Sequence, residues 1–283
     1  MKLLDKTDYR RVVEKIRAAD MNTFFALSVL EGKVDGNVFA DETGSPSSIY
    51  IQHPYGMSLL FGEMKNGEFN GWLRGHLLNS GKTRDRFEWL QACPAPLYAG
   101  IEDLLGGRLI KKNPDVPYEQ TFSQSEDKDV LEYRRINFVF NDAKYRLLKD
   151  GLKNNGHEIV TTTERMFNES EGTVIPRRFW NNAADFFRHG TGRSLILEDG
   201  SVASTAFASF VIGKKFEIGV ETVKRFHGKN FGASVCSALI DHCLANGYEP
   251  VWSCLSGNAG SVKLALKLGF EEKKRVPYYR LAK

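Results

Sequence analysis

The sequence predicts an α+β fold in which a mixed sheet is flanked by helices and the chain forms two halves of similar size. Short apolar runs separated by turn residues alternate with segments of helical periodicity. The length of 283 residues exceeds one average domain. Hydrophobic residues at 42% and charged residues at 26% are typical of globular proteins. The chain can therefore bury a core, and a wholly disordered chain is excluded.

The first half begins with a helical pattern and continues with a strand meander. Apolar residues at helical spacing predict a helix from Tyr9 to Gly32, where glycine ends it. Turn residues at Gly44–Pro46 and Pro54–Gly56 separate three strand patterns. The elements predicted next are strands at Asn37–Ala40, Ser48–Gln52 and Met57–Phe61, a helix at Trp72–Leu78, a strand at Phe87–Ala92, a helix at Tyr98–Leu105 and a strand at Ile136–Phe140.

The second half repeats this order. Asn141 or Asp142 is an N-cap residue for a helix that ends at Leu152, and Pro176 opens a helix that runs through Phe187. Asp199–Gly200 is a hairpin signal, and Gly247 is a helix-ending residue. The other elements predicted are an extended segment at His157–Thr163, strands at Ser194–Glu198, Ala203–Val211 and Phe216–Thr222, a helix at Gly232–Asn246, a strand at Val251–Leu255, a helix at Ala259–Leu268 and a final strand at Tyr278–Leu281.

Each half thus contains helices, a three-strand meander, a helix, a strand and another helix. We interpret this pattern as a structural repeat, although the two halves share negligible sequence identity. The predicted domains are residues 1–140 and residues 141–283.

Charge, cysteines and hydropathy exclude several classes of function. The net charge of +4 is small and the charges are interspersed, so we predict no nucleic-acid partner. The four cysteines form no Cys-x-x-Cys pair, so we predict neither a disulfide framework nor a metal site. Residues 1–20 lack the apolar core of a secretion signal, and no later run reaches membrane-spanning length. We therefore predict a cytoplasmic protein with no membrane partner, either a monomer or a homodimer.

The most informative segment is the junction between the Phe216–Thr222 strand and the helix that begins near Gly232. Its loop reads His227, Gly228, Lys229, Asn230, Phe231, Gly232 and Ala233. Small residues at such a junction let consecutive backbone N–H groups converge, and the helix N-terminus adds partial positive charge. Lys229 adds a flexible point charge. The loop therefore favours a phosphate or pyrophosphate, although many strand-to-helix turns use glycine for geometry alone.

Two other phosphate-binding folds are disfavoured. Three strands in antiparallel order precede the loop, whereas a dinucleotide-binding fold opens with a βαβ unit. A P-loop is excluded because no Gly-Lys-Ser/Thr sequence closes the loop.

The segment from Phe216 to Phe270 resembles the coenzyme A-binding core of the GNAT acetyltransferases. That family has Gln/Arg-x-x-Gly-x-Gly/Ala in this loop, and the stretch from Asn258 through Ser261 to Leu268-Gly269-Phe270 matches the second half of the core. Within this superfamily, the sequence is most similar to the zwittermicin A resistance type, which includes self-resistance acetyltransferases of paenilamicin and edeine producers. The resemblance implies the acyl-CoA N-acyltransferase (GNAT) fold, an active C-terminal domain and a degenerate N-terminal GNAT-like domain.

Three positions depart from the family pattern. His227 replaces Gln/Arg, and Asn230 replaces a central glycine. Asparagine tolerates a left-handed backbone, so the turn can survive. Ala265 stands where many members carry a tyrosine that acts as general acid, so that acid is another group, a water molecule or unnecessary. Tyr278 and Tyr279 are candidate substitutes for this acid, although aromatic packing in a strand is the favoured explanation for both residues.

The resemblance implies direct transfer of acetyl from acetyl-CoA, without a metal, to an amine. A base deprotonates the substrate ammonium, the amine attacks the thioester, and a strand N–H stabilises the oxyanion. The resemblance implies that this N–H, and the backbone that pairs with pantetheine, belong to Val220 through Thr222. It implies that the pyrophosphate lies against the backbone of His227 through Ala233. Glu217 and Glu221 share a strand face, so either is a candidate base or docking anion; the alternative is an exposed carboxylate paired with lysine.

Other candidates have structural alternatives. Asn258 either bridges to pantetheine or caps the following helix, and the resemblance favours the first. Ser261 is a candidate near the thiol, although a first-turn serine is more often structural. His227 either contacts phosphate or is merely solvated. Cys254 has no histidine beside it, so a core role is favoured over a nucleophile.

The first half has glycines from Gly62 to Gly67 but lacks the loop spacing, so it is interpreted as shaping the acceptor site. The favoured function is acetylation of a small cationic substrate, a polyamine or peptide antibiotic, for self-resistance. Two alternatives remain: a general small-amine or protein N-acetyltransferase, and a catalytically silent acyl-CoA-binding regulator.

Overall fold

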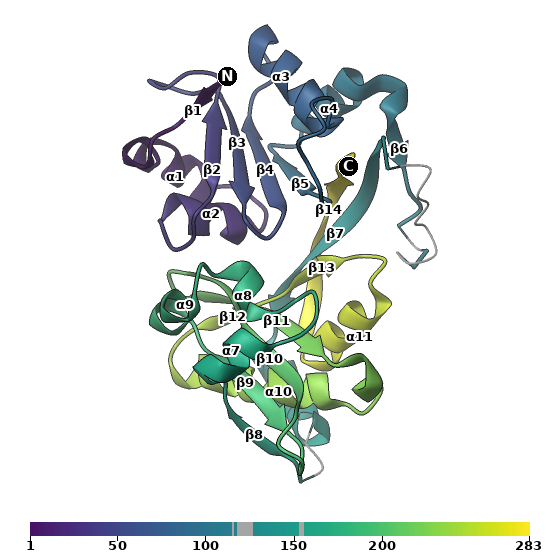
Figure 1. Ribbon diagram of the computed structural model, residues 1–283. Coiled ribbons are helices and arrows are strands. Elements are labelled where there is room, and N and C mark those ends of the chain that lie inside the picture. Colours follow the sequence, from purple (N-terminus) through teal and green to yellow (C-terminus); the bar gives the residue numbers. More distant parts are fainter. Residues whose placement is uncertain (115, 118–126, 153–155) are drawn as a thin grey trace. The chain divides into compact units, whose positions relative to one another are not determined.

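The computed structural model describes residues 1–114, 116–117, 127–152 and 156–283 (Figure 1). The chain divides into two compact units. Unit 1 comprises Met1–Asn137, Cys254–Ala259 and Lys274–Lys283, and unit 2 comprises Phe138–Ser253 and Gly260–Lys273. The first transition, at residues 137–138, lies close to the linear boundary at 140. Cys254–Ala259 and Lys274–Lys283 belong to unit 1, so the units are not two continuous stretches of the chain.

Unit 1 is built on the predicted meander and a parallel crossover. Strands β2, β3 and β4 pair in antiparallel order, α3 follows, and β5 returns parallel to β4. The elements up to β7 are β1 (Lys2–Leu3), η1 (Lys6–Asp8), α1 (Arg10–Arg17), α2 (Phe24–Leu30), β2 (Asn37–Ala40), β3 (Ser48–His53), β4 (Met57–Gly62), α3 (Gly67–Leu77), β5 (Trp89–Cys93), α4 (Leu97–Leu105), η2 (Gly106–Arg108), β6 (Leu109–Lys111) and β7 (Val130–Phe140).

The core of unit 1 lies between this sheet and α3 and α4. Tyr50, Leu60 and Leu90 on the strands are fully buried against Leu73 and Ile101 on the two helices. Helix α2 packs against β3 and β4. The single helix predicted for Tyr9–Gly32 is two helices, since the chain leaves helical geometry between Ala18 and Thr23.

Unit 2 holds a five-stranded sheet in the order β12-β11-β10-β9-β8, with antiparallel pairing except for the parallel pair β11–β12. The elements from residue 142 on are α6 (Asp142–Leu148), η4 (Lys149–Leu152), β8 (Glu158–Thr161), α7 (Glu164–Glu169), α8 (Pro176–Phe179), α9 (Ala183–His189), β9 (Gly192–Ile196), β10 (Val202–Ile212), β11 (Lys215–Thr222), η5 (Lys224–Phe226), α10 (Phe231–Ala245), β12 (Glu249–Val251), β13 (Ser253–Leu255), α11 (Ala259–Lys267) and β14 (Phe270–Arg280).

Helices cover both faces of the unit 2 sheet. Helix α10 packs against β9, β10 and β11 through a buried side that includes Val235, Cys236 and Cys243. On the other face, the Phe179 ring of α8 contacts the rings of Phe207 and Phe210 on β10. A bulge at residue 209 of β10 shifts the register opposite β11. The mixed sheet with flanking helices agrees with the predicted α+β class.

Two more predicted elements are divided in the structure. The helix expected from Pro176 to Phe187 stops at Phe179, and Asn182 begins α9 by accepting the Asp185 N–H at 2.9 Å. The strand expected at Val251–Leu255 is two strands that belong to different sheets. The division of the strand depends on tertiary pairing, which local patterns do not encode, whereas the second helix begins at the local Asn182 cap.

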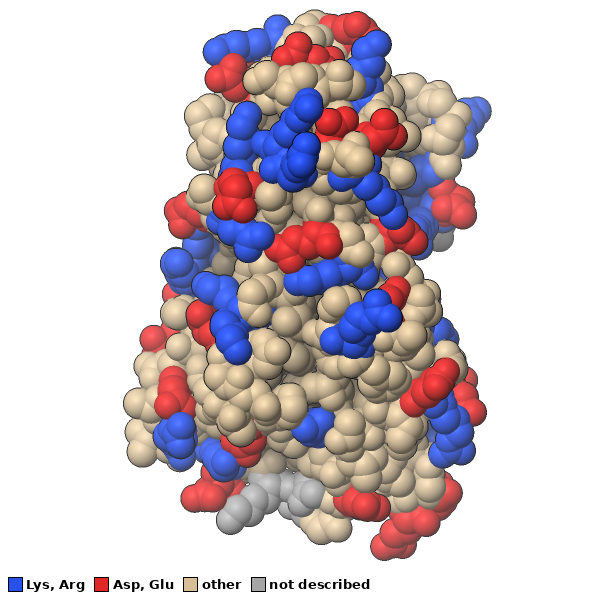
Figure 2. Space-filling model, turned by 90° about the vertical axis from the view of Figure 1, so that its left-hand side faces the viewer, with Lys and Arg blue, Asp and Glu red and all other residues tan. Residues whose placement is uncertain are grey.

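On the face shown in Figure 2, Lys and Arg side chains are interspersed with Asp and Glu side chains. Within the described residues, no helix is long and apolar enough to cross a membrane. Among the same residues, no group of three or more His, Cys, Asp or Glu side chains is arranged to hold a metal ion.

Candidate functional site

Strand β11 has one edge that is only partly paired. The parallel pairing with β12 comprises Lys215↔Glu249, Phe216↔Pro250 and Glu217↔Val251, and the chain then leaves this sheet at Trp252. Within the described part of unit 2, no strand continues the pairing along residues 218–222. The backbone groups of Val220 and Thr222, two predicted cofactor contacts, therefore lie on a segment of β11 that keeps a free edge.

The loop after β11 is held in a compact shape by its own residues. The His227 Nε2–H donates to the Thr222 carbonyl oxygen at 2.8 Å, which closes the loop back onto the end of the strand. Gly228 has a φ of +81° and Asn230 a φ of +66°. The expectation that asparagine supports a left-handed turn here is confirmed. The His227 ring is committed to the backbone, while its contact with phosphate stays a prediction.

The N-terminus of α10 presents backbone donors that have no hydrogen-bond acceptor among the described residues. The first backbone bond of the helix runs from the Ser234 N–H to the Asn230 carbonyl at 3.2 Å, so the N–H groups of Phe231, Gly232 and Ala233 precede it. Asn230 does not cap them: its Oδ1 accepts from the Lys267 Nζ at 2.6 Å instead. An uncapped first turn combined with the helix dipole is a site for an anion.

Gly232 is closely packed at this junction. A Cβ on this residue would lie 3.1 Å from the Thr222 Oγ1, closer than most real contacts. The small residue therefore brings the first turn of α10 next to the end of β11.

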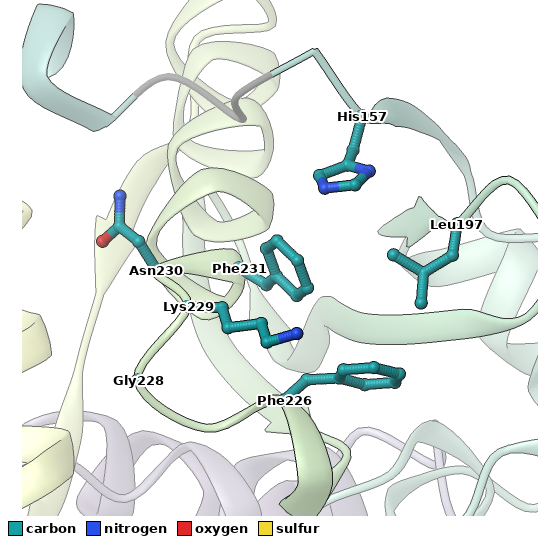
Figure 3. Close-up of a pocket in the computed structure, with 7 residues that line it drawn as sticks. All are labelled: His157, Leu197, Phe226, Gly228, Lys229, Asn230 and Phe231. Atoms are coloured by element: carbon teal, nitrogen blue, oxygen red, sulfur yellow. The ribbon is translucent and has the colours of Figure 1, made fainter.

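A pocket of about 480 Å³ lies beside the loop (Figure 3). The Lys229 side chain extends between the Phe226 and Phe231 rings, and its Nζ lies 5.4 Å from the centre of the Phe226 ring. The His157 ring stands edge-on to Phe231 at 5.0 Å. The Asn230 side chain points away from this pocket. The pocket therefore combines aromatic surfaces with one ammonium group, next to the donors of α10.

Glu217 and Glu221 lie on the α8 side of the sheet, as strand alternation predicts. Val220 and Thr222 on the same strand face Gly232 of α10, so the carboxylates point the other way. Glu217 is 5% exposed and occupies the last register pair before β12 departs. It also lies opposite the bulge in β10.

Glu221 is bound to a loop that the sequence analysis did not single out. Its Oε2 accepts the backbone N–H groups of Thr173 at 2.9 Å and Val174 at 2.8 Å. Gly172 has a φ of +128°, and a Cβ there would lie within 2.7 Å of the Glu221 side chain. The Ser170–Gly172 stretch carried turn signals, but nothing local connected it to a residue 48 positions later.

The remaining candidates have structural surroundings. The Trp252 Nε1–H donates to the Ser261 Oγ at 3.2 Å, so Ser261 supports a buried tryptophan. Asn258 is exposed and directly precedes α11. Ala265 is completely buried on α11, so its side chain is part of the core. The structure brings together the loop residues and Val220 through Thr222, while Ser261 is held by tryptophan.

Helix α3 of unit 1, which lies between the parallel strands β4 and β5, has a capped N-terminus. The Asn66 Oδ1 accepts the Phe69 N–H at 3.0 Å, which caps the helix. Glu68 adds a carboxylate in the first turn, 2.8 Å from the Met1 ammonium. A capped and acidic first turn disfavours phosphate.

Comparison with known proteins gives consistent results. A family model described as GNAT acetyltransferase matches residues 17–279. The uncharacterized N-acetyltransferase YdfB of Bacillus subtilis is 22% identical over 251 residues, which are 87% of this chain and 86% of that protein.

Two solved structures resemble the whole chain. A GCN5-related N-acetyltransferase-like protein from Streptococcus suis has a TM-score of 0.68 at 20% identity, covering 98% of this chain and 100% of that one. A tandem GNAT protein from the clavulanic acid biosynthesis pathway has a TM-score of 0.55 at 13% identity, covering 98% and 95%. At these identities the likeness shows the fold alone, which is the fold expected from the sequence.

Proposed function

Because this chain belongs to the GNAT acetyltransferase family, we propose that unit 2 binds acetyl-CoA and acetylates an amine of a small cationic molecule. The family consists of N-acetyltransferases, and YdfB, a relative of this chain, is named as an N-acetyltransferase. The proposal concerns which residues of this chain act and which class of amine they receive.

The observation that carries the cofactor proposal is the uncapped first turn of α10. The N–H groups of Phe231, Gly232 and Ala233 fit the pyrophosphate of acetyl-CoA, because they lie at the positive end of a 15-residue helix. Gly228 and Asn230, both at positive φ, keep the approach to these groups free of bulk. Lys229 supplies a cation beside them.

The neighbouring pocket fits the nucleotide end of acetyl-CoA. The Phe226 and Phe231 rings offer apolar faces for a purine, and the Lys229 ammonium fits a phosphate oxygen. Pantetheine would pair with the free edge of β11 at Val220 and Thr222. Asn258 remains a candidate contact from the start of α11.

Glu217 is the favoured base. Bound acetyl-CoA supplies the acetyl group as a thioester. Glu217 stands where β11 loses its partner, so its carboxylate lies beside the backbone segment that would hold the cofactor. There it accepts the proton of the acceptor ammonium, while a β11 N–H donates to the oxygen on which negative charge develops. Ser261 has less support, because its hydroxyl already accepts from Trp252.

Unit 1 is proposed to be a degenerate GNAT-like domain. Its β4–α3–β5 crossover repeats the parallel β11–α10–β12 crossover of unit 2, and each follows an antiparallel meander. The capped α3 supports a role without coenzyme A. The tandem GNAT protein among the similar structures supports the same interpretation.

A cationic antibiotic is the favoured acceptor, since acetylation removes a positive charge and would give self-resistance. This choice follows from the resemblance to the resistance-type acetyltransferases. To test it, the chain is incubated with acetyl-CoA and a panel of polyamines, cationic peptide antibiotics and unrelated peptides, and products are analysed by mass. Acetylated antibiotic or polyamine supports the proposal; acetylation of the unrelated peptides alone contradicts the acceptor class. Tight acetyl-CoA binding without any product identifies the silent regulator.

A further inference from the structure

A second pocket of unit 2, of about 270 Å³, lies beside Glu221 on the sheet face opposite α10. Its floor includes Thr205 and Glu221, which are register partners on β10 and β11. Met166 and Ile175, from α7 and the segment before α8, add apolar walls. The volume is small for a drug-sized ligand and suits a short aliphatic chain.

Glu221 is preorganised in this pocket. The Thr173 and Val174 N–H groups both donate to Oε2, which orients the carboxylate. Only glycine at position 172 lets the loop approach so closely, because a Cβ would overlap the Glu221 side chain. The carboxylate is therefore held in place before any ligand arrives, which lowers the entropic cost of binding.

The second oxygen of Glu221 is available. Every hydrogen bond of this carboxylate within the described residues ends on Oε2, so Oε1 retains its lone pairs. Glu221 is partly buried, so a ligand that covers Oε1 must replace its contact with water, and an ammonium group would compensate that cost.

The charge of the lining favours a cation. The lining includes three acidic residues, Glu169, Glu171 and Glu221, and two arginines, Arg165 and Arg225. Arg165 is 3.9 Å from Glu169, so these two charges largely cancel. The Arg225 guanidinium lies over the Phe226 ring at 4.8 Å. One negative charge remains in excess.

We infer that this pocket binds an ammonium group on an aliphatic chain, with Glu221 Oε1 as its acceptor. This inference rests on the proposed function in one respect: the bound ammonium is a second amine of the acceptor, which is not the one acetylated. Glu221 then selects diamines and polyamines, while Glu217 acts as base. The two carboxylates on one strand face have separate roles.

The test compares 1,5-diaminopentane with 5-aminopentan-1-ol, which differ by one ammonium group. The wild-type chain is expected to prefer the diamine by about tenfold or more in kcat/KM, as one charge-assisted hydrogen bond predicts. In Glu221→Gln the amide oxygen still accepts from Thr173 and Val174, while an NH2 group replaces Oε1. This variant should lose the preference through a higher KM for the diamine.

Glu164→Gln is the matched control, because Glu164 is an exposed α7 carboxylate outside the pocket lining. It should keep the preference. An unchanged preference in Glu221→Gln, or a loss confined to kcat, would overturn the inference.

Calorimetric binding of 1,5-diaminopentane in the presence of CoA separates this inference from the proposed function. A wild-type chain that acetylates no amine contradicts the proposed function. Diamine binding that weakens in Glu221→Gln supports the pocket even then. Equal binding by both chains contradicts it.

Discussion

Glu217 and Val251 form the last register pair between β11 and β12, and beyond this pair β11 pairs, within the described part of the chain, with β10 alone. A buried carboxylate thus stands at the start of an open strand edge. That edge ends in the loop that leads to the uncapped α10. The arrangement places the proposed base, a strand edge that can pair with pantetheine and an anion site on one short segment, residues 217–233.

Replacement of the base gives the first prediction. Glu217→Gln keeps the side-chain shape but cannot accept a proton, so kcat should fall by about 100-fold or more. The KM for acetyl-CoA should stay unchanged, since the anion site is untouched. Steady-state kinetics with a saturating amine measure both. Glu158→Gln, which alters an exposed carboxylate on β8, is the control. A kcat of the variant within about threefold of the wild-type value would show that Glu217 is not the base.

The left-handed turn gives the second prediction. Asn230→Gly retains the φ of +66° without strain, whereas Asn230→Val places a β-branched residue there at a cost of about 1–2 kcal/mol. Both variants lose the hydrogen bond from Lys267, so their difference isolates the backbone. We expect the valine variant to bind acetyl-CoA about tenfold more weakly than the glycine variant in calorimetry. Equal affinities would mean that the loop does not hold the cofactor.

The closed N-terminus of α3 gives the third prediction. One acetyl-CoA should bind per chain, because Asn66 caps α3 and no side chain caps α10. Calorimetry with the wild-type chain measures the stoichiometry. Binding of two molecules per chain would contradict the proposal that unit 1 is degenerate. Independently, Asn66→Ala should lower the free energy of unfolding by about 1 kcal/mol.

Turns and helix ends with a strong local signal were predicted correctly from the sequence. Gly200 and Gly247 have φ values of +79° and +68°, as the hairpin and helix-end signals required. Helix α10 differs from its predicted range by one residue at each end.

Long-range relationships were not predicted. The hydrogen bond between Glu221 and the Thr173 N–H joins residues that are 48 positions apart, and no sequence pattern in either segment predicts this contact. The last strand is 11 residues long, and its end belongs to unit 1, although only Tyr278–Leu281 carried a strand pattern. Pairing with a strand distant in sequence supplied the rest.

A buried charged cluster in unit 1 gives the fourth prediction. Burial raises the pKa of Glu88, but the hydrogen bond and charge of His76, the charge of Arg84 and the Tyr50 hydroxyl outweigh it and lower the pKa to about 2. The folded pKa lies below the unfolded one, so the ionised carboxylate stabilises the fold above about pH 4.5. This contribution, about 3 kcal/mol, is lost as the pH falls towards 2.

Glu88→Gln provides the comparison. The variant should be less stable than wild type at pH 6, because Arg84 loses its carboxylate. The difference in unfolding free energy should shrink as the pH falls from 4.5 to 2, as followed by denaturant titration at each pH. A difference that is constant across this range would show that Glu88 does not have a lowered pKa.

Release of free thiol from acetyl-CoA, measured with and without polyamines and cationic peptide antibiotics, tests the central claim most directly. The account predicts thiol release that requires both the amine and Glu217, with one acetylated amine formed for each thiol. Acetyl-CoA binding without release of thiol on any amine, or release that does not depend on the amine, would contradict an N-acetyltransferase with this substrate class.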